Sequence, residues 1–317
     1  MRDLSILIPS RNEMFLNNTV NDILANREAD TEIIVVLDGQ WPIEGLPDDP
    51  RVRIIYHDES IGQRAATNEA ARLSTAKYVM KADAHCSFDK GFDRKLMETC
   101  QPDWTVVPRM YNLHVFDWKC KKCGQQWYMG PIPSTCNGEK PCGATGEGNF
   151  ERVMVWQPRW NRKSDYMMFD KDLHFQYWSG YRKRPEAKGE ITDLMSCIGA
   201  CWMMERERYW FLEGMDENHG SWGQMGTELS AKSHLSGGRM VINKTTWFSH
   251  MFRTQAGFGF PYPNPGIGAR AYSQDLWRKG KWKKAVHPLS WLIEKFSPIP
   301  TWDEKEIELL RQEEKRK

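Results

Sequence analysis

The first hundred residues alternate short β-rich runs with stretches of helical periodicity, and this alternation constrains the fold more than any other feature. The strand-like runs are 4–8, 33–37, 52–56 and 78–80, and the helix-like segments are 20–25 and 63–74. The rhythm predicts a doubly wound α/β sheet, because parallel strands need helical crossovers between them. Ligands of such sheets bind beyond the carboxyl ends of the strands, so we expect functional residues at 9–13, 38–39 and 83–85.

Length and charge narrow the possibilities further. A chain of 317 residues accommodates one large α/β domain with an insert, or two packed halves. The 44 Lys and Arg residues exceed the 42 Asp and Glu residues by only two, so any polyanion-binding surface must be a local patch. No run approaches the roughly 18 apolar residues of a membrane span, and the N-terminus lacks a signal peptide's apolar core. We therefore expect a cytoplasmic protein with no membrane partner.

Asp83 and His85 follow the apolar run 78–80. Side chains at positions i and i+2 point the same way at the end of a strand. A carboxylate beside an imidazole suits a divalent ion such as Mn²⁺ or Mg²⁺. The alternative is an aspartate that caps the next turn beside a solvated histidine, and the motif alone leaves both interpretations open.

Segment 81–86 resembles the Asp-x-His-Cys motif of the polypeptide N-acetylgalactosaminyltransferases, a retaining GT-A family. Five more segments resemble motifs of that family in the same order, namely 8–13, 62–65, 172–178, 222–230 and 249–253. The resemblance covers most of residues 4–262. It implies a GT-A fold, a Rossmann-like doubly wound mixed sheet, and a UDP-sugar donor.

The resemblance also implies individual roles. Asp83, His85 and His250 would bind the metal. Arg64 and Arg253 would face the diphosphate, where guanidinium forks match phosphate oxygens. Two alternatives stay open, because Arg64 could instead pair on a helix surface and His250 could be a core histidine. The donor-binding set is Pro9, Arg11, Glu13, Asp38, Arg64, Asp83 and Trp222.

One departure from the family pattern affects catalysis. The first Glu and the Asn of the family's Trp-Gly-Gly-Glu-Asn signature are replaced by Met225 and Gly226, which leaves Glu228 as the carboxylate of that segment. We expect Glu228 to be catalytic together with Arg253, and Asp216 is an alternative carboxylate. An inverting enzyme needs a general base, whereas retaining transfer can use the leaving phosphate, so the sequence favours retention.

Four cysteines form a separate motif. Cys120 and Cys123 are followed by Cys136 and Cys142 in a segment rich in Gly, Pro and Lys. The two-pair spacing predicts a closed, structural Zn²⁺ site that folds a polar insert. Two disulfides or unligated thiols are the alternatives.

The acceptor is indicated less directly. Segment 152–184 interleaves cations with aromatic rings, and segment 278–284 is basic. This mixture is typical of nucleic-acid surfaces, although a solvated face over a Trp-rich core would look the same. The interpretation favours DNA carrying a 5-hydroxymethylpyrimidine, as in phage-type modification in a host cytoplasm. The expected acceptor-binding residues are Trp160, Trp178, Arg182 and Lys183.

Two other functions stay open. One is Ser/Thr glycosylation of protein, as the family resemblance implies, and the other is a non-catalytic nucleotide-sugar or nucleic-acid binding module. We predict four parts of the chain: a nucleotide-sugar-binding half at 1–109, a zinc insert at 110–150, an acceptor and catalytic half at 151–272, and a basic extension at 273–317.

Overall fold

The computed structural model describes residues 2–42, 44–260 and 267–315. Four parallel strands form the N-terminal part of its main sheet, namely β1 (Leu4–Ser10), β2 (Thr31–Asp38), β3 (Val52–His57) and β4 (Tyr78–Ala82). Helices α1 (Leu16–Asn26) and α2 (Gln63–Leu73) connect them. The predicted α/β alternation is therefore confirmed.

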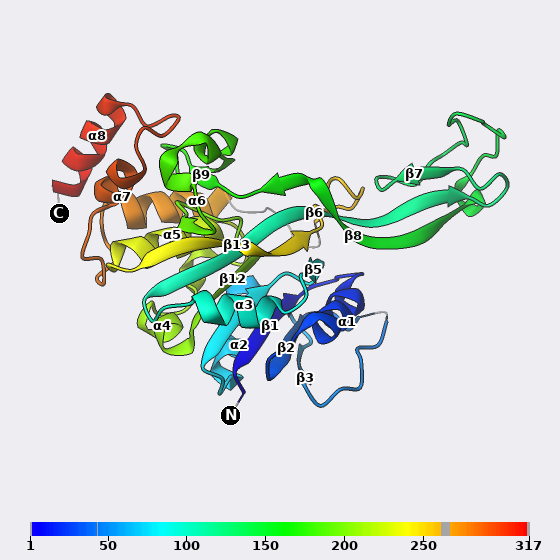
Figure 1. The fold of residues 1–317 in the computed structure, drawn as a ribbon, viewed down its shortest axis with the longest axis horizontal. Helices are drawn as coiled ribbons and strands as arrows, with labels where there is room; N and C mark the ends of the chain where they lie inside the picture. The colour runs from blue at the N-terminus through cyan, green and yellow to red at the C-terminus, as the bar shows by residue number, and fades with distance from the viewer. Residues whose placement is uncertain (1, 43, 261–266, 316–317) are drawn as a thin grey trace.

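The sheet continues with strands from the second half of the chain. Strand β12 (Cys201–Glu205) runs antiparallel to β4, and β6 (Trp104–Cys120) lies between β12 and β13 (Arg239–His250). Strands β5 (Cys86–Phe88) and β11 (Ile191–Asp193) pair with β13. The result is a mixed sheet of 11 strands among the described residues (Figure 1). Because β12 and β13 come from the predicted acceptor half and β1 to β4 from the predicted donor half, the two predicted halves share one sheet.

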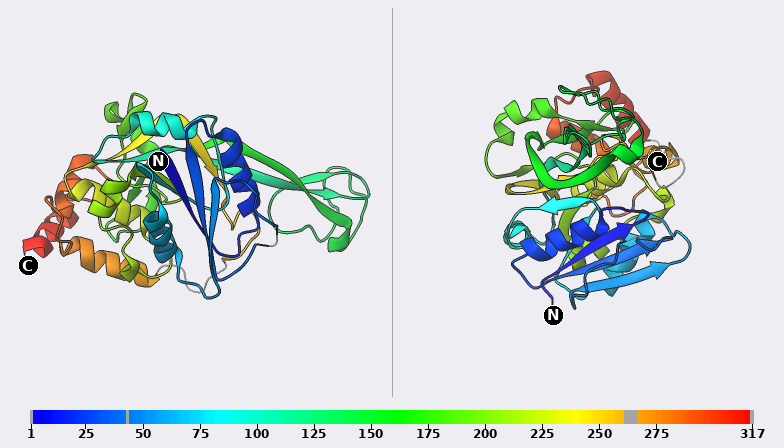
Figure 2. Two further views of the ribbon diagram at one scale, coloured as in Figure 1. Left: turned by 90° about the horizontal axis from the view of Figure 1, so that it is seen from below. Right: turned by 90° about the vertical axis from the view of Figure 1, so that its right-hand side faces the viewer.

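A long arm extends from this body. Strand β6 and strand β8 (Phe150–Ser164) form an antiparallel ladder that projects to one side, with β7 (Gln126–Tyr128) and the cysteine segment at its far end (Figures 1 and 2). The predicted insert 110–150 thus begins inside the main sheet, where residues 110–112 pair with β13, and its cysteine segment lies at the outer end of the arm (Figure 1).

Helices pack on both faces of the sheet. Every residue of β2 is buried; Ile33 and Val35 point into one hydrophobic cluster, and Ile34 and Val36 into the other. The other helices are α3 (Phe92–Thr99), α4 (Arg206–Phe211), α5 (Met225–Leu235), α6 (Ile267–Ser273), α7 (Leu289–Phe296) and α8 (Glu304–Lys315). A two-stranded sheet of β9 (Met167–Phe169) and β10 (Phe175–Tyr177) completes the fold. None of the helices formed by the described residues is long and apolar enough to cross a membrane.

Candidate active site

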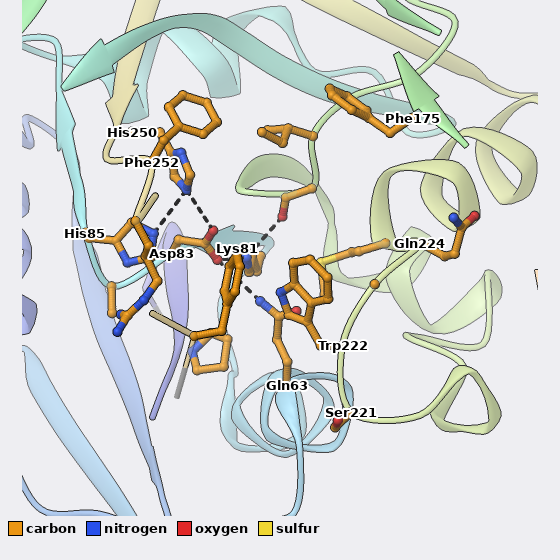
Figure 3. Close-up of a pocket in the computed structure, with 18 of the residues that line it drawn as sticks. Gln63, Lys81, Asp83, His85, Phe175, Ser221, Trp222, Gln224, His250 and Phe252 are labelled. Carbon is orange, nitrogen blue, oxygen red and sulfur yellow. Dashed lines mark hydrogen bonds and ion pairs between the residues drawn. The ribbon is translucent and has the colours of Figure 1, made fainter. Parts of the chain in front are cut away.

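A cavity of about 510 Å³ opens at the carboxyl ends of β1, β2 and β4. Its sheet side is lined by the residues that follow these strands, including Arg11, Asp38 and Asp83. The opposite wall comes from β10, from the loop 197–199 and from the loop 221–225 (Figure 3). Its position is the one that doubly wound topology predicts for a ligand site.

Asp83, His85 and His250 meet at the floor of this cavity. Their ligand atoms lie within 4.8 Å of one another, and His250 Nε2 is 3.1 Å from His85 Nε2 and 3.2 Å from Asp83 Oδ2 (Figure 3). Strand pairing brings them together, because His250 at the end of β13 lies opposite Cys86 of β5. Two facing imidazole nitrogens beside a carboxylate oxygen form a donor set that suits Mn²⁺.

Burial and neighbouring charges tune these groups. Burial lowers the pKa of His250, which keeps that imidazole in the neutral form a metal ligand requires. Burial would also lower the pKa of His85, but the carboxylate of Glu13, 3.1 Å from its Nδ1, raises it above its ordinary value. Glu13 thereby orients the ring of His85 from behind, as carboxylates do for metal-binding histidines.

Lys81 also belongs to this site, and the sequence analysis gave it no role. Its side chain is buried, lines the cavity, and donates hydrogen bonds to Asp83 Oδ1 and to the carbonyl oxygen of Gly199, the latter at 3.0 Å (Figure 3). Burial would raise the pKa of Asp83, but Lys81 together with His250 and His85 outweighs that effect and lowers it. The available signal was a lysine two positions before Asp83 in an otherwise apolar strand.

The donor-side predictions converge on the same cavity. Asp38 accepts hydrogen bonds from Ser60 Oγ at 2.8 Å and from the Ile61 and Gly62 amides at 2.6 and 3.1 Å, which fixes the entry to α2. Arg253 binds Glu13 at 3.0 Å. Seven of the predicted residues line the cavity: Pro9, Arg11, Glu13, Asp38, Asp83, Trp222 and Arg253.

Residues 5–133 match the family model for Glycosyl transferase family 2. This part of the chain is therefore similar to the glycosyl transferase family 2 domains. The matched region includes β1, β2, β3 and β4, and therefore Asp38, Asp83 and His85.

Two curated proteins of Drosophila melanogaster are similar in sequence. Putative polypeptide N-acetylgalactosaminyltransferase 13 is 24% identical over 277 residues, which cover 82% of this chain and 43% of that protein. Polypeptide N-acetylgalactosaminyltransferase 3 is 25% identical over 121 residues, which cover 36% of this chain and 17% of that protein. The chain thus spans less than half the length of the relatives it matches.

One solved structure shares the fold across the whole chain. The crystal structure of GalNAc-T7 with UDP, GalNAc and Mn²⁺ superposes with a TM-score of 0.62 at 15% identity, and covers 99% of this chain and 54% of that one. The predicted GT-A-like fold is therefore confirmed.

Arg64 and Glu228 require a correction. Neither lines the cavity; both are buried and bind each other, with Arg64 Nε 2.9 Å from Glu228 Oε2. Arg64 also donates to the carbonyl oxygens of Gly220 and Gly223, and Lys232 lies 2.9 Å from Glu228 Oε1. The pair supports the loop that carries Trp222, so neither residue is placed to contact the diphosphate or an acceptor.

Asp216 is likewise placed outside the cavity wall. Its carboxylate accepts hydrogen bonds from the Asn218 amide at 3.0 Å and from the hydroxyl of Tyr272 at 2.9 Å. The predicted alternative carboxylate therefore ties a turn to α6 and does not face the cavity.

None of the predicted acceptor residues lines the cavity either. Trp178 is buried, with Arg184 stacked 4.7 Å from its ring, so it is not available to a base. Trp160 is 61% exposed but packs on Trp247, three residues before His250 in β13. Since side chains alternate along a strand, Trp247 and His250 point to opposite faces of the sheet.

The predicted basic patches also differ from one another. Arg182 and Lys183 are exposed, and no ion pair joins them to the part of the chain that the structure describes. In segment 278–284, by contrast, Arg278 pairs with Glu313 and Lys279 pairs with Asp275. That predicted basic surface is therefore neutralised in part, by the two carboxylates of Glu313 and Asp275.

The four predicted zinc ligands come together at the far end of the arm. All four sulfur atoms lie within 4.8 Å of one another, with Cys120 3.7 Å from Cys142 and Cys123 3.5 Å from Cys136. The cysteines are free thiols. A hydrogen bond from the Cys123 amide lowers the pKa of Cys120 to about 7. The Cys142 amide would likewise lower the pKa of Cys136, but burial and the neighbouring thiols raise it to about 12, so without a metal the four thiols share few negative charges.

Proposed function

We propose that the chain transfers a sugar from a UDP-sugar to a hydroxyl acceptor in a reaction that depends on a divalent metal ion. One observation carries the proposal: Asp83, His85 and His250 converge at the strand-end edge of a domain similar to the family 2 domains and face a cavity. The similarity to a fold solved with UDP, GalNAc and Mn²⁺ supports it. The metal would hold the diphosphate and neutralise charge on the leaving group.

The residues of the cavity divide into two groups. Pro9, Arg11 and Asp38 lie at the ends of β1 and β2 and would hold the base and ribose. Arg253, whose Nη1 is held by Glu13 at 3.0 Å, would bind phosphate oxygens. Phe175 and Trp222 face the space beyond the metal ligands, where the sugar and the acceptor would meet (Figure 3).

We propose retention of the anomeric configuration. The carboxylates that line the cavity, among the described residues, are Glu13, Asp38 and Asp83. Glu13 is bound by Arg253, Asp38 caps the entry to α2, and Asp83 is a proposed metal ligand. Since each is already engaged, the leaving phosphate is the base that remains for the acceptor hydroxyl.

For the acceptor we propose first a Ser or Thr hydroxyl of a polypeptide, because the curated relatives are named as polypeptide transferases. A 5-hydroxymethylpyrimidine in DNA is the second candidate. Its supporting observation is the pair of exposed cations Arg182 and Lys183, which would bind phosphate. A base in a duplex would have to flip out to reach the cavity.

The test is a transfer assay with a panel of UDP-sugars, Mn²⁺, and either a Ser- and Thr-containing peptide or hydroxymethylated DNA. UDP release together with a sugar-sized mass increase on one acceptor is the expected result. The Asp83→Asn variant should release no UDP, whereas Asp48→Asn, an exposed carboxylate outside the cavity, should behave as wild type. If no donor gives UDP release, either by transfer or by hydrolysis, the result supports the non-catalytic binding module instead.

We also propose that the four cysteines bind one structural Zn²⁺. Tetrahedral Zn–S bonds of about 2.3 Å place the sulfur atoms about 3.8 Å apart, close to the 3.5 and 3.7 Å separations in the cluster. A disulfide would require about 2.05 Å. The distances therefore favour a metal site over the disulfide alternative.

A further inference from the structure

The buried side chain of Lys81 carries an inference that goes beyond the roles proposed above. Its ammonium group donates to Asp83 Oδ1, while Asp83 Oδ2 faces His250 Nε2 at 3.2 Å. One carboxylate oxygen is thus occupied by a fixed cation, and the other is left for a metal ion. Because Lys81 lies at the floor of the cavity, its charge is not screened by bulk water.

The charges around the metal ligands cancel. Asp83 and Glu13 are the negative groups next to the two histidines, and each is paired with a cation, Lys81 in one case and Arg253 in the other. The histidines add no negative charge. A divalent ion entering the empty cavity therefore meets a donor set whose charge the protein has already neutralised.

We propose that Lys81 makes binding of the divalent ion depend on the diphosphate of the nucleotide, so that metal and nucleotide bind as a unit. This inference rests on the proposed function, because it needs both ligands to share the cavity. A metal ion alone would be repelled by Lys81 at close range, with little net protein charge to offset the repulsion. The diphosphate supplies the missing negative charge, and both cations then stabilise it.

Thermodynamic reciprocity makes the proposal measurable. If UDP tightens Mn²⁺ binding by some factor, Mn²⁺ must tighten UDP binding by the same factor. Removal of the Lys81 charge should strengthen Mn²⁺ binding in the absence of UDP. The further gain in Mn²⁺ affinity that UDP produces should then be smaller. The coupling factor between the two ligands should therefore fall.

The experiment titrates Mn²⁺ by electron paramagnetic resonance, with and without UDP, in wild type, Lys81→Met and Lys81→Gln. Lys81→Gln keeps a hydrogen-bond donor near Asp83 and removes only the charge. Lys232→Met is the matched control, since Lys232 is also buried and also donates to a carboxylate and to a glycine carbonyl oxygen, but lies outside the cavity. Thermal unfolding with and without Mn²⁺ verifies that each variant is folded and gives a second measure of binding.

The expected result is weak Mn²⁺ binding by the wild-type protein alone and tight binding with UDP. Both Lys81 variants should bind Mn²⁺ alone at least about tenfold more tightly, with a coupling factor reduced at least about tenfold. The Lys232 control should keep the wild-type coupling. Unchanged or weaker Mn²⁺ binding in both Lys81 variants would overturn the inference and leave the proposed function standing, whereas a wild-type protein that binds neither Mn²⁺ nor UDP would overturn both.

Discussion

Replacement of Glu228 distinguishes a structural carboxylate from a catalytic one. Its oxygens bind Arg64 at 2.9 Å, Lys232 at 2.9 Å and the Asp216 amide at 2.6 Å, and the side chain is fully buried. Glu228→Ala leaves two buried cations without a counter-charge, which typically costs about 3–5 kcal/mol of the free energy of unfolding. For a domain of this size, at about 2 °C per kcal/mol, the melting temperature should fall by roughly 6–10 °C.

The pKa of Glu228 leads to a similar magnitude. Burial would raise this pKa, but Lys232 and Arg64 outweigh burial and lower it to about 2 from an ordinary value of 4.5. At about 1.4 kcal/mol per pKa unit, the difference corresponds to about 3 kcal/mol. Since the folded-state pKa is lowered, this stabilisation is complete above pH 4.5 and is lost as the pH falls from 4.5 towards 2.

Urea unfolding of wild type and Glu228→Ala, followed by circular dichroism at pH 7 and pH 4, measures the effect. Glu207→Gln is the control, because Glu207 is exposed on α4 and should change stability by less than about 0.5 kcal/mol. Glu228→Ala should still release UDP. Its rate per folded molecule should be reduced, because the loop that carries Trp222 shifts, but it should not be abolished. A variant of normal stability that has lost all turnover would refute this reasoning and restore a catalytic role.

Three further predictions concern Asp83, the cysteine cluster and His234. Asp83→Asn should weaken Mn²⁺ binding more than about 100-fold, since loss of a residue that only hydrogen-bonds to a metal ligand already costs about 10–100-fold in metal affinity. Electron paramagnetic resonance of free Mn²⁺ measures the affinity. Elemental analysis should find one zinc per chain, and Cys123→Ser should remove it. Burial lowers the pKa of His234 to about 4 from 6.5, so the free energy of unfolding should fall by about 3 kcal/mol as the pH drops from 6.5 to 4. His234→Gln, which can still donate to the Leu194 carbonyl oxygen, should remove that slope in pH-dependent unfolding.

That Asp38 and Asp83 lie at one cavity could be predicted because strand topology determines it, whereas His250 was indicated by the family resemblance alone. Asp38 and Asp83 follow β-rich runs, and the carboxyl ends of parallel strands meet at one edge of the sheet. The clustering of the four cysteines was predictable for a different reason, since their spacing is local. Both kinds of signal depend on the identity of a residue and its position within one element.

Arg64 and Glu228 could not be placed from sequence because their environment is made by distant segments. They are 164 residues apart, and nothing near either one indicates that the other neutralises it. An arginine at the start of a helix near a donor site suggests a phosphate contact until its partner is known. Lys81 was missed for the opposite reason, because it lies in a strand whose sequence is typical of a buried core. Its position in the cavity depends on a hydrogen bond to the carbonyl oxygen of Gly199, 118 residues away.

The arm packs against the loop 251–258, which forms part of the cavity wall. Gly257 lies so close to the arm that a Cβ added to it would be 2.5 Å from the carbonyl carbon of Gly130. In addition, the side chain of Asn112 in β6 donates a hydrogen bond of 3.1 Å to Gln255. Both contacts belong to the loop 251–258, which also carries Arg253, the proposed phosphate ligand. A two-stranded ladder is marginal alone, so a metal at the far end of the arm would help to hold it rigid. A metal bound by the cysteine cluster would therefore stabilise the cavity wall that carries Arg253, although the cluster lies at the far end of the ladder.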